Sequence, residues 1–598
     1  MGTTENIELG QHKRTISKGM VLLLLALFVA FLAAWPLIGE PGFLNTRGGG
    51  DSPFLLQRLQ QLESALTDGH FPVRWMSDAN YGFGYPFYNY YAPLSIYIAT
   101  IFRFFGYPFV QSIELTQLAG FLAAAWGMFL LAKRWFTSEW AGFLASVAYT
   151  VAPFHMVNIY VRGDSLAEFW AMVWYPWILL AADRLFERDE TGFPFGAVAG
   201  LALAYAALIL SHNISALIFS PFLLFFILLR WFFSKKPLRR DSNDPTSSNH
   251  RTKLLPILFG LLLALGLSAW FFLPALVEQD LAQLGPVTEG YFHYNNHFRG
   301  ANLLQSSVLF DYDVSGGNAF RMGLMQGVAA FLGALALLYA TFRTRIVAVA
   351  VTSFILLSLL IATLMITPLS RFLWDNLPLL SFTQFPWRFL SVQAFFAALA
   401  TGALGLLPLR RLWVPLTAVL LIGAGLLGLQ TDNLLLTDQD ITSERLAWYE
   451  WFTGNIGSTV SAEYLPLTVQ PRVYNSSWLN TGQLSSVRAL SGNLLQAKQL
   501  EEGATRQTWA VNVSEEGATL MFPTMLWPGW VAEVNGDETQ IQPASGSGLI
   551  TVDVPPGENQ VDLRLTRTPL RLAAELLSLA ALIVTLLLVA KSAGRPKF

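Results

Sequence analysis

The sequence predicts an α-helical polytopic membrane protein with about 12 transmembrane helices and an extracytoplasmic β-sandwich domain before the last helix. Three observations lead to this fold class. Hydrophobic residues make up 53% of the 598 residues and charged residues only 13%, which is too apolar for a soluble globular protein. Runs of about 20 apolar residues recur, each long enough to cross a bilayer as a helix. One long stretch near the C-terminus is instead polar and alternates as β-strands do.

Hydropathy gives the boundaries of the predicted spanning helices. They are 19–38, 113–133, 138–157, 166–185, 193–211, 214–233, 254–276, 323–342, 345–367, 388–407, 411–430 and 569–590. A further apolar stretch, 92–107, is short and contains Arg103, so we predict an interfacial helix there. The first run follows Lys13, Arg14 and Lys18, but it is long and lacks a small-residue cleavage site. We therefore expect a retained first helix rather than a signal peptide.

Basic residues then fix the expected orientation, because loops rich in Lys and Arg stay in the cytoplasm. If 92–107 does not span, the basic clusters all fall on one side: Lys133 and Arg134, Arg184 and Arg188, loop 230–253, Arg343 and Arg345, Arg410 and Arg411, and 591–597. Both termini are thus expected in the cytoplasm of a cell with this protein in its plasma membrane. The expected domains are a transmembrane domain over 1–430, a β-rich domain outside over 431–568, and a last helix with a basic tail over 569–598.

Two extracytoplasmic stretches carry recognisable patterns. In the first outer loop, 39–112, Leu55, Leu59, Leu62 and Leu66 form one apolar helical stripe, which predicts a helix along the membrane surface. In 431–568, short alternating runs are separated by turn signals such as Asn535-Gly536 and Pro555-Pro556-Gly557. This second pattern predicts the β-sandwich.

Composition also excludes several kinds of chemistry. The chain has no cysteine, so disulfides, thiolate catalysis and zinc–thiolate sites are excluded. Its seven histidines form no His-Glu-x-x-His motif, and we predict no histidine-built metal site. The net charge of -2 comes without the basic face of a nucleic-acid binder. We therefore expect no nucleic-acid partner.

Acidic residues in the outer loops are the first candidates for chemistry. Asp51 is either a carboxylate that deprotonates an acceptor hydroxyl or the cap of the following helix, since Asp-Ser-Pro is a helix-start signal. Arg162, Asp164 and Glu168 lie at the outer ends of two predicted helices, where unpaired charges are costly. They form either a functional cluster or a structural Arg162–Glu168 ion pair with Asp164 as a helix cap.

Further polar and aromatic residues are candidates for substrate binding. Arg371 and Arg388 lie near the outer face, where an arginine binds a lipid phosphate or simply extends to the interface. His212 ends a helix and is either a loop-end polar residue or a phosphate or sugar contact. Tyr85 and Tyr91 belong to an aromatic run that either stacks on a sugar and lines a polyprenyl groove, or belongs to the interfacial aromatic belt.

The pattern resembles the GT-C class of membrane glycosyltransferases, with Asp51 in the first outer loop, Ala92-Pro93-Leu94 in the interfacial part, and a second acidic position in the next outer loop. Shorter stretches are similar to bacterial membrane proteins named for a "6-pyruvoyl-tetrahydropterin synthase-related" domain. They are Gly50-Asp51, Gly82-Phe83-Gly84-Tyr85-Pro86, Tyr160-Val161-Arg162-Gly163, Phe272-Leu273-Pro274-Ala275 and Gln384-Phe385-Pro386-Trp387-Arg388. The outer β domain, with Trp527-Pro528-Gly529-Trp530, is similar to one in YfhO-like proteins.

The resemblance implies a GT-C-like fold over 1–430 and transfer of a sugar, with inversion, from a polyprenyl-phosphate donor to a cell-envelope glycan, lipid or protein. It implies that Asp51 is the base and that Asp164 or Glu168 is the second acidic position. Many GT-C enzymes carry a clearer acidic pair in the first loop than the single Asp51 here. The base and the use of a divalent cation, Mg or Mn, therefore stay open.

Two other classes remain as alternatives. A transporter would suit twelve helices with a basic central loop, but 133–140 lacks the Gly-x-x-x-Asp-Arg-x-Gly type of motif of such carriers. A non-catalytic scaffold would use 431–568 to bind an envelope polymer. Solute counterflow would favour the transporter, and polymer binding without dependence on a lipid carrier would favour the scaffold.

Overall fold

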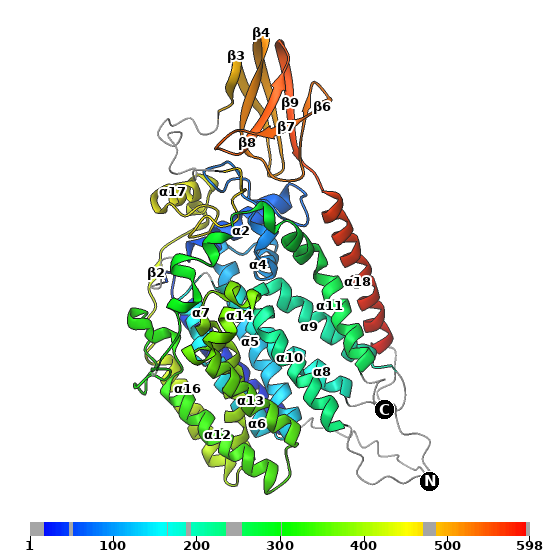
Figure 1. Cartoon of the computed structure of the whole chain (residues 1–598). Helices are drawn as coiled ribbons and strands as arrows, with labels where there is room; N and C mark the ends of the chain where they lie inside the picture. Colours follow the sequence, from blue (N-terminus) through cyan, green and yellow to red (C-terminus); the bar gives the residue numbers. More distant parts are fainter. Residues whose placement is uncertain are drawn as a thin grey trace, which may run out of the picture.

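The computed structural model describes residues 17–46, 52–163, 165–186, 193–234, 254–300, 302–469 and 486–593. Figure 1 shows a bundle of helices with a β domain at one end, and the last helix, α18, runs from the β domain along the bundle. Short helices and loops lie between the two. We call residues 52–107 and 438–469, which form most of this middle region, the cap layer. The fold is therefore a helical bundle, a cap layer and a β domain.

Every predicted hydrophobic range holds a helix. The bundle helices are α1 (Lys18–Ile38), α5 (Phe109–Phe136), α6 (Glu139–Thr150), α7 (Pro153–Tyr160), α8 (Leu166–Phe186), α9 (Phe195–Ser211), α10 (Asn213–Ser234), α11 (Leu254–Val277), α12 (Leu324–Phe342), α13 (Val349–Met365), α15 (Leu390–Gly402), α16 (Arg410–Leu426) and α18 (Pro569–Ala593). Short helical turns extend some of them. The prediction of an α-helical polytopic membrane protein is confirmed.

Fewer helices than twelve are long and apolar enough to cross a membrane. Within the described residues, eight meet this condition by length and composition, or nine if α13 and the following Pro368–Asn376, bent by 92°, count as one. The ranges predicted as 166–185, 193–211 and 411–430 are helices α8, α9 and α16. Of these, α9 and α16 have only 17 residues each, and α8 carries Glu168, Asp183 and Arg184.

One predicted span, 138–157, has a short break in its backbone hydrogen bonding but still counts as one of the eight candidate spans, Glu139–Tyr160. α6 ends at Thr150 and α7 begins at Pro153, because a proline suits the first turn of a helix but cannot donate within one. α7 then leads to Arg162 and to the first turn of α8. The span formed by α6 and α7 therefore ends just before the charged start of α8.

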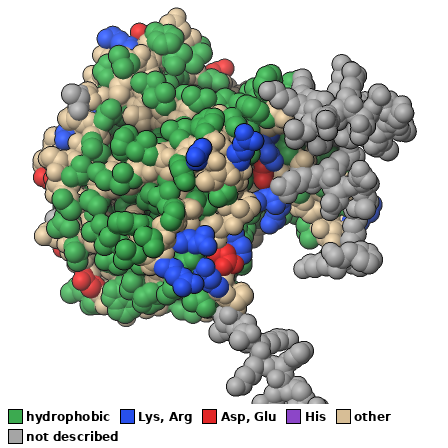
Figure 2. Space-filling view, turned by 90° about the horizontal axis from the view of Figure 1, so that it is seen from below, with side chains coloured by type: hydrophobic (Ala, Val, Ile, Leu, Met, Phe, Trp, Pro, Cys, Tyr) green, Lys and Arg blue, Asp and Glu red, His purple; other side chains and the backbone are tan. Residues whose placement is uncertain are grey.

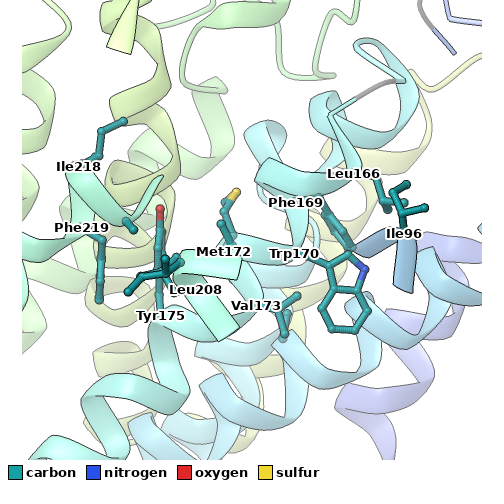
Figure 3. Packing of buried hydrophobic residues seen from close by; sticks show 14 of the residues in the cluster. Ile96, Leu166, Phe169, Trp170, Met172, Val173, Tyr175, Leu208, Ile218 and Phe219 are labelled. Carbon is teal, nitrogen blue, oxygen red and sulfur yellow. The ribbon is translucent and has the colours of Figure 1, made fainter. Parts of the chain in front are cut away.

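α8 lies at the centre of the apolar core. Its Tyr175 ring stacks on Phe219 of α10 with ring centroids 4.1 Å apart. Figure 3 shows residues of α8 between Ile96 of α4 (Leu94–Phe104) on one side and α9 and α10 on the other, namely Phe169, Trp170, Met172, Val173 and Tyr175, with Leu208, Ile218 and Phe219 opposite. Burial on several sides fixes the rotation of α8 and hence the direction of its polar residues.

The cap layer contains α2 (Pro53–Thr67), α3 (Phe87–Tyr90), α4 and α17 (Ser443–Thr453). The predicted leucine stripe of α2 is buried against α4 and α5, but its opposite face is covered too. Gln57 donates a hydrogen bond to the buried carboxylate of Glu450 on α17 at 2.9 Å, and Arg58 donates to the carbonyl of Ser458 at 3.0 Å. α2 is thus covered on both faces within the cap layer, and its position along the membrane surface stays a prediction.

The β domain is confirmed as a C-terminal β-rich unit. Its strands are β3 (Arg488–Glu502), β4 (Arg506–Met525), β5 (Trp530–Val534), β6 (Asp537–Thr539), β7 (Ile541–Pro543), β8 (Leu549–Val554) and β9 (Gly557–Leu565). They form one antiparallel sheet in the order β6-β5-β9-β4-β8-β7, with β3 also paired to β4. β9 pairs with the first half of β4 and β8 with the second. The long strand β4 therefore joins the two halves of the domain.

Predicted turn signals fall at the observed turns. Asn535 and Gly536 join β5 to β6 with φ of 56° and 89°, the left-handed pair that a two-residue hairpin turn requires. A second small pairing ties the chain together, since β1 (Phe43–Leu44) pairs with β2 (Asn433–Leu434). This pairing joins the chain that precedes α2 to the chain that follows α16.

A buried charge network joins α18 to the rest of the protein. Arg571, only 2% exposed, binds both carboxylate oxygens of Glu278 at 3.1 and 3.0 Å. Arg74 and Arg567 both pair with Glu575, at 3.3 and 3.0 Å. Three arginines and two glutamates therefore meet where the β domain enters α18.

His70 lies beside this network. Its lowered pKa predicts that the stability of the folded protein depends on pH. Burial, and then the positive charges of Arg567, Arg74 and Arg571, lower the pKa of His70 from 6.5 to about 4. In the unfolded chain, His70 takes up a proton as the pH falls below 6.5. In the folded protein it stays neutral until the pH reaches about 4. Stability is therefore lost as the pH falls through this window, by roughly 3 kcal/mol at 1.36 kcal/mol for each unit of pKa.

We expect the unfolding temperature of His70→Gln to fall less than that of the wild type between pH 7 and pH 4.5, because glutamine takes up no proton there. Thermal unfolding in detergent, followed by tryptophan fluorescence, measures the difference between the two slopes. Acidic residues elsewhere contribute equally to both proteins. Parallel slopes for the two proteins would contradict the prediction.

The face opposite the β domain collects charged helix ends. Asp183 of α8 is buried and pairs with Arg134 of α5 at 2.7 Å and Arg230 of α10 at 2.9 Å. Lys18 lies over the Trp140 ring, and Lys591 over Phe195. Figure 2 shows this face, where Lys and Arg side chains gather toward one side beside a largely hydrophobic surface. The bundle thus has one basic end, and the first turn of α8 lies at the other.

Candidate active site at the start of α8

Four of the predicted site residues come together at the start of α8. Arg162 follows α7, Glu168 lies in the first turn of α8, and Arg388 lies in the 3-10 helix Pro386–Phe389. His212 lies between α9 and α10. These residues are separated by up to about 220 positions in sequence, and only the packing of the bundle makes them neighbours. Asp51 and Asp164, the other predicted acidic residues, lie outside the described residues.

Glu168 is the centre of the cluster. Its carboxylate is 2% exposed, and Oε2 accepts a hydrogen bond from Arg162 Nη1 at 2.5 Å and lies 3.6 Å from Arg388 Nε. Glu168 and both arginines are near enough to act electrostatically on the His212 ring, whose Nδ1 accepts a hydrogen bond from Ser215 N at 3.2 Å. The predicted Arg162–Glu168 ion pair is present, and a second arginine joins it. The structural and functional interpretations of these residues therefore concern the same cluster.

Residues that the sequence analysis did not select complete the surroundings of Arg162. Asn158 Oδ1 accepts a hydrogen bond from Arg162 Nη1 at 2.7 Å. The guanidinium lies 5.0 Å from the centre of the Trp387 ring, which is itself stacked between Phe320 and Phe385 at 4.3 and 4.7 Å. Their closeness in sequence to the arginines could have indicated these two residues: Asn158 lies four residues before Arg162, and Trp387 directly precedes Arg388. The signal from Trp387 is weak, because aromatic residues are frequent throughout this chain. The rings exclude water and strengthen the charge interactions beside them.

Among the described residues, which leave out Asp51 and Asp164, two cations face one anion in the cluster. Arg162 and Arg388 carry the positive charges and Glu168 the negative one, and a neutral His212, whose Nδ1 accepts from Ser215 N, has one N–H to donate. Oε1 of Glu168 is buried and has no hydrogen-bond partner among the described residues. A pair of neighbouring arginines is suited to an anion, because guanidinium groups bind phosphate oxygens with charge-assisted hydrogen bonds.

The chain on either side of residues 47–51 lies beside the same turn. Thr46 N donates to Ser52 Oγ at 3.4 Å, and both residues are buried. Thr46 also packs against Gly163, which has a φ of +57°, and a Cβ at Gly163 would lie 2.2 Å from Thr46 Cγ2. Only glycine permits this approach without strain. The described residues that flank Asp51 are therefore anchored next to Arg162.

Three other predicted site residues lie apart from the cluster. Arg371, in α14 (Arg371–Asn376), is exposed and lies 3.7 Å from Asp375. Tyr85 is fully buried in the cap layer, where its hydroxyl donates to the Glu463 carbonyl at 2.6 Å and contacts Thr459. Burial raises the pKa of Tyr85 well above its usual value. This position packs the cap layer and offers no surface to a substrate.

Tyr91 also serves the cap layer. Its hydroxyl accepts a hydrogen bond from Arg58 Nη1 at 3.0 Å, the guanidinium lies 4.5 Å from the ring centre, and Phe87 stacks on the ring at 4.6 Å. These contacts use one face and the polar end of the ring inside the protein. Tyr85 therefore lies in the interior of the cap layer, whereas Tyr91 is partly exposed and its contact with a sugar or polyprenyl chain stays a prediction.

The sequence left open whether the protein uses a divalent cation. Among the described residues, no three His, Asp or Glu side chains gather in a way that could hold a metal ion. His293 and His297, four residues apart, lack a third ligand there. Asp51 and Asp164 are not covered by this observation. No step of the proposal below depends on a metal.

The fold and the cluster define a multi-pass membrane protein with a charged site at one end of its helical bundle. No family model matches the chain. A protein of Lactococcus lactis subsp. cremoris (strain MG1363), described as uncharacterized, is 25% identical over 259 residues, which cover 42% of this chain and 39% of that protein. The similarity to pterin-synthase-related and YfhO-like proteins stays a prediction.

Two solved structures are similar in part. A mutant of arabinofuranosyltransferase AftD from Mycobacteria is 15% identical with a TM-score of 0.45, covering 70% of this chain and 29% of that one. Oligosaccharyltransferase AglB from Archaeoglobus fulgidus, solved with an inhibitory peptide and a dolichol-phosphate, is 13% identical with a TM-score of 0.39, covering 73% of this chain and 57% of that one. This chain thus matches less than two thirds of the length of each.

Proposed function

We propose that this protein is a glycosyltransferase that moves a sugar from a polyprenyl-phosphate donor to an extracytoplasmic acceptor, with inversion. One observation carries the proposal: two arginines contact one buried glutamate beside His212, at the end of the bundle opposite its basic face, among the residues that the structure describes. Two guanidinium groups held together at this end are suited to the phosphate of a lipid-linked donor. A hydroxyl of an envelope glycan, lipid or protein is the acceptor.

The arginines stabilise the leaving group in this mechanism. A base removes the proton from the acceptor hydroxyl, whose oxygen attacks the anomeric carbon from the face opposite the phosphate. The bond between that carbon and the phosphate oxygen breaks, and polyprenyl phosphate leaves with the electron pair and one additional negative charge. Arg162 and Arg388 meet this charge with donors that are already positioned, so little reorganisation is needed as it develops.

Glu168 and Asp51 then have different roles. Because Glu168 is already paired with two arginines, we assign it the positioning of their guanidinium groups rather than proton removal. Asp51 is the proposed base, supported by the position of its flanking residues Thr46 and Ser52 beside Gly163. His212 is a proposed contact of the phosphate or the sugar.

The proposed orientation follows from the two ends of the bundle. The end with Lys18, Arg134 and Arg230 carries the positive charge that the positive-inside rule assigns to the cytoplasm. The start of α8, the cap layer and the β domain then face the outside of the cell. A sugar donor exposed on the outer leaflet would meet Arg162 and Arg388 there.

Transfer from labelled donors tests the proposal. We expect purified protein in nanodiscs to move label from at least one polyprenyl-phosphate sugar into a water-soluble product when cell-envelope extract is supplied. Arg388→Gln should lower the rate about 100-fold or more, as the loss of a transition-state donor does. Asp51→Asn should abolish transfer while donor binding remains.

Arg445→Gln is the matched control, because Arg445 is 64% exposed on α17 and pairs only with Asp440 among its recorded ion pairs. It should transfer sugar at the wild-type rate. If none of the labelled polyprenyl-phosphate sugars loses its label, the glycosyltransferase proposal fails. Solute counterflow and polymer binding then become the next measurements.

A further inference from the structure

A cleft of about 750 Å³ lies near the cluster, between the segment that follows α11 and the 3-10 helix Pro378–Thr383. Its lining is amphiphilic. Polar groups come from Gln279, Asp280 and Gln283, and apolar surface comes from Leu379, Phe382 and Leu467. The volume is that of a ligand pocket rather than of a packing defect, and the cleft is open at the surface.

Hydrogen bonds hold the walls of this cleft in place. Gln283 N donates to the Leu465 carbonyl at 2.8 Å, and its side-chain amide donates to the carbonyls of Pro466 and Val469 at 3.0 and 2.8 Å. Leu467 N donates to the Leu281 carbonyl at 3.1 Å. Two segments more than 180 residues apart are thus fixed against each other, so the cleft is preformed.

One wall of the cleft leads directly to the cluster. Phe382 lines the cleft, and the next two residues accept hydrogen bonds from Arg388 Nη1: the Thr383 carbonyl at 3.0 Å and Gln384 Oε1 at 3.1 Å. Gln384 in turn donates to the Val287 carbonyl at 2.8 Å, which ties it to the segment of the opposite wall. A molecule in the cleft would therefore contact Phe382, the residue directly before the two that hold Arg388.

The cleft and the cluster differ in the charged groups that they present. The described part of the cluster holds the guanidinium groups of Arg162 and Arg388, whereas the charged group among the described residues that line the cleft is the exposed carboxylate of Asp280. A carboxylate only accepts hydrogen bonds, so it repels a phosphate and binds hydroxyl groups. Gln279 adds an exposed amide, and the Phe382 ring, 38% exposed, offers a flat apolar surface.

We propose that this cleft binds the acceptor, and that the acceptor segment it holds is a neutral, hydroxyl-rich glycan chain. Hydroxyl groups would bind Asp280 and Gln279, and the apolar face of a sugar ring would lie on Phe382. The phosphate of the donor stays at Arg162 and Arg388. This inference rests on the proposed glycosyltransferase function and names the acceptor class for it.

Saturation-transfer NMR on the full-length protein in nanodiscs tests the cleft. The probes are a set of neutral trisaccharides of glucose, galactose, mannose and arabinose, and separately the short polyprenyl phosphate citronellyl phosphate. We expect saturation transfer to at least one trisaccharide. Asp280→Asn and Phe382→Leu should each weaken its binding about tenfold, the loss expected for one strong contact to a charged group or a ring.

Matched controls lie on the same segments but outside the cleft lining. Glu289→Gln removes an exposed carboxylate nine residues after Asp280, and Phe372→Leu removes an exposed ring ten residues before Phe382. Both should bind the trisaccharide as the wild type does. Asp280→Asn should leave the binding of citronellyl phosphate unchanged, whereas Arg388→Gln should weaken it.

Three results would overturn the inference: no trisaccharide receives saturation, the cleft variants bind it as tightly as the wild type, or Asp280→Asn changes citronellyl phosphate binding. Failure of the proposed function looks different. In that case the trisaccharide still binds and depends on Asp280, but no donor loses its label. If both hold, label from the donor should appear on the bound trisaccharide.

Discussion

Replacing Glu168 by alanine is expected to destabilise the protein by about 3–5 kcal/mol, the cost of leaving a buried charge without its partner. The carboxylate is 2% exposed and is the shared counter-charge of Arg162 and Arg388. Without it, the two guanidinium groups repel each other in a setting where water cannot screen them. Thermal unfolding in detergent, followed by tryptophan fluorescence, should show a markedly lower transition for this variant.

Two further variants separate charge from shape. Glu168→Gln keeps the volume but removes the charge, and should resemble Glu168→Ala. Adding Arg162→Met to Glu168→Gln removes one of the two cations that have lost this carboxylate, so the double variant should be at least as stable as the single one. Added citronellyl phosphate should raise the unfolding temperature of Glu168→Gln more than that of the wild type, since an anion replaces the lost charge. A Glu168→Ala protein that unfolds at the wild-type temperature would refute this account.

Arg571→Met is expected to cost about as much, 3–5 kcal/mol, by exposing a different buried pair. Arg571 binds both oxygens of Glu278, and Asn89 also donates to that carboxylate at 2.8 Å. The variant leaves Glu278, 5% exposed, with the amide alone. Because Arg571 Nη1 also donates to the Pro528 carbonyl at 2.8 Å, the junction between the β domain and α18 should loosen.

The nearby Arg567 provides the control for this prediction. It is 56% exposed in its ion pair with Glu575, so Arg567→Met should cost no more than about 1 kcal/mol. The double variant Arg571→Met/Glu278→Gln should be more stable than Arg571→Met, since it removes the unpaired carboxylate. Limited proteolysis between β9 and α18 should be faster in Arg571→Met than in Arg567→Met or in the double variant. Equal unfolding temperatures for Arg571→Met and Arg567→Met would contradict the prediction.

The candidate site was only partly accessible to prediction. Charges near hydrocarbon are costly, so Arg162, Glu168 and Arg388 could be selected one by one from the sequence. Their convergence on one carboxylate depends on three separate elements of the bundle and could not be foreseen. Tyr85 and Tyr91 show the opposite case. An aromatic ring at a membrane surface suits a substrate, a lipid or a packed interior equally well, and here Tyr85 is fully buried in the cap layer while Tyr91 is partly exposed.

Local sequence determined the class of this protein, its helices and its strands. Hydropathy over about 20 residues and alternation over about six act along one segment, and turn pairs such as Asn535-Gly536 require particular backbone angles wherever they occur. The tertiary structure alone decided which helices are long enough to span, that α2 is covered on both faces, and that Arg388 reaches Glu168. These outcomes depend on side chains contacted from distant parts of the chain, and a residue's local pattern carries no information about its partner. The cleft beside Arg388 belongs to the same category, because its walls come from segments more than 180 residues apart.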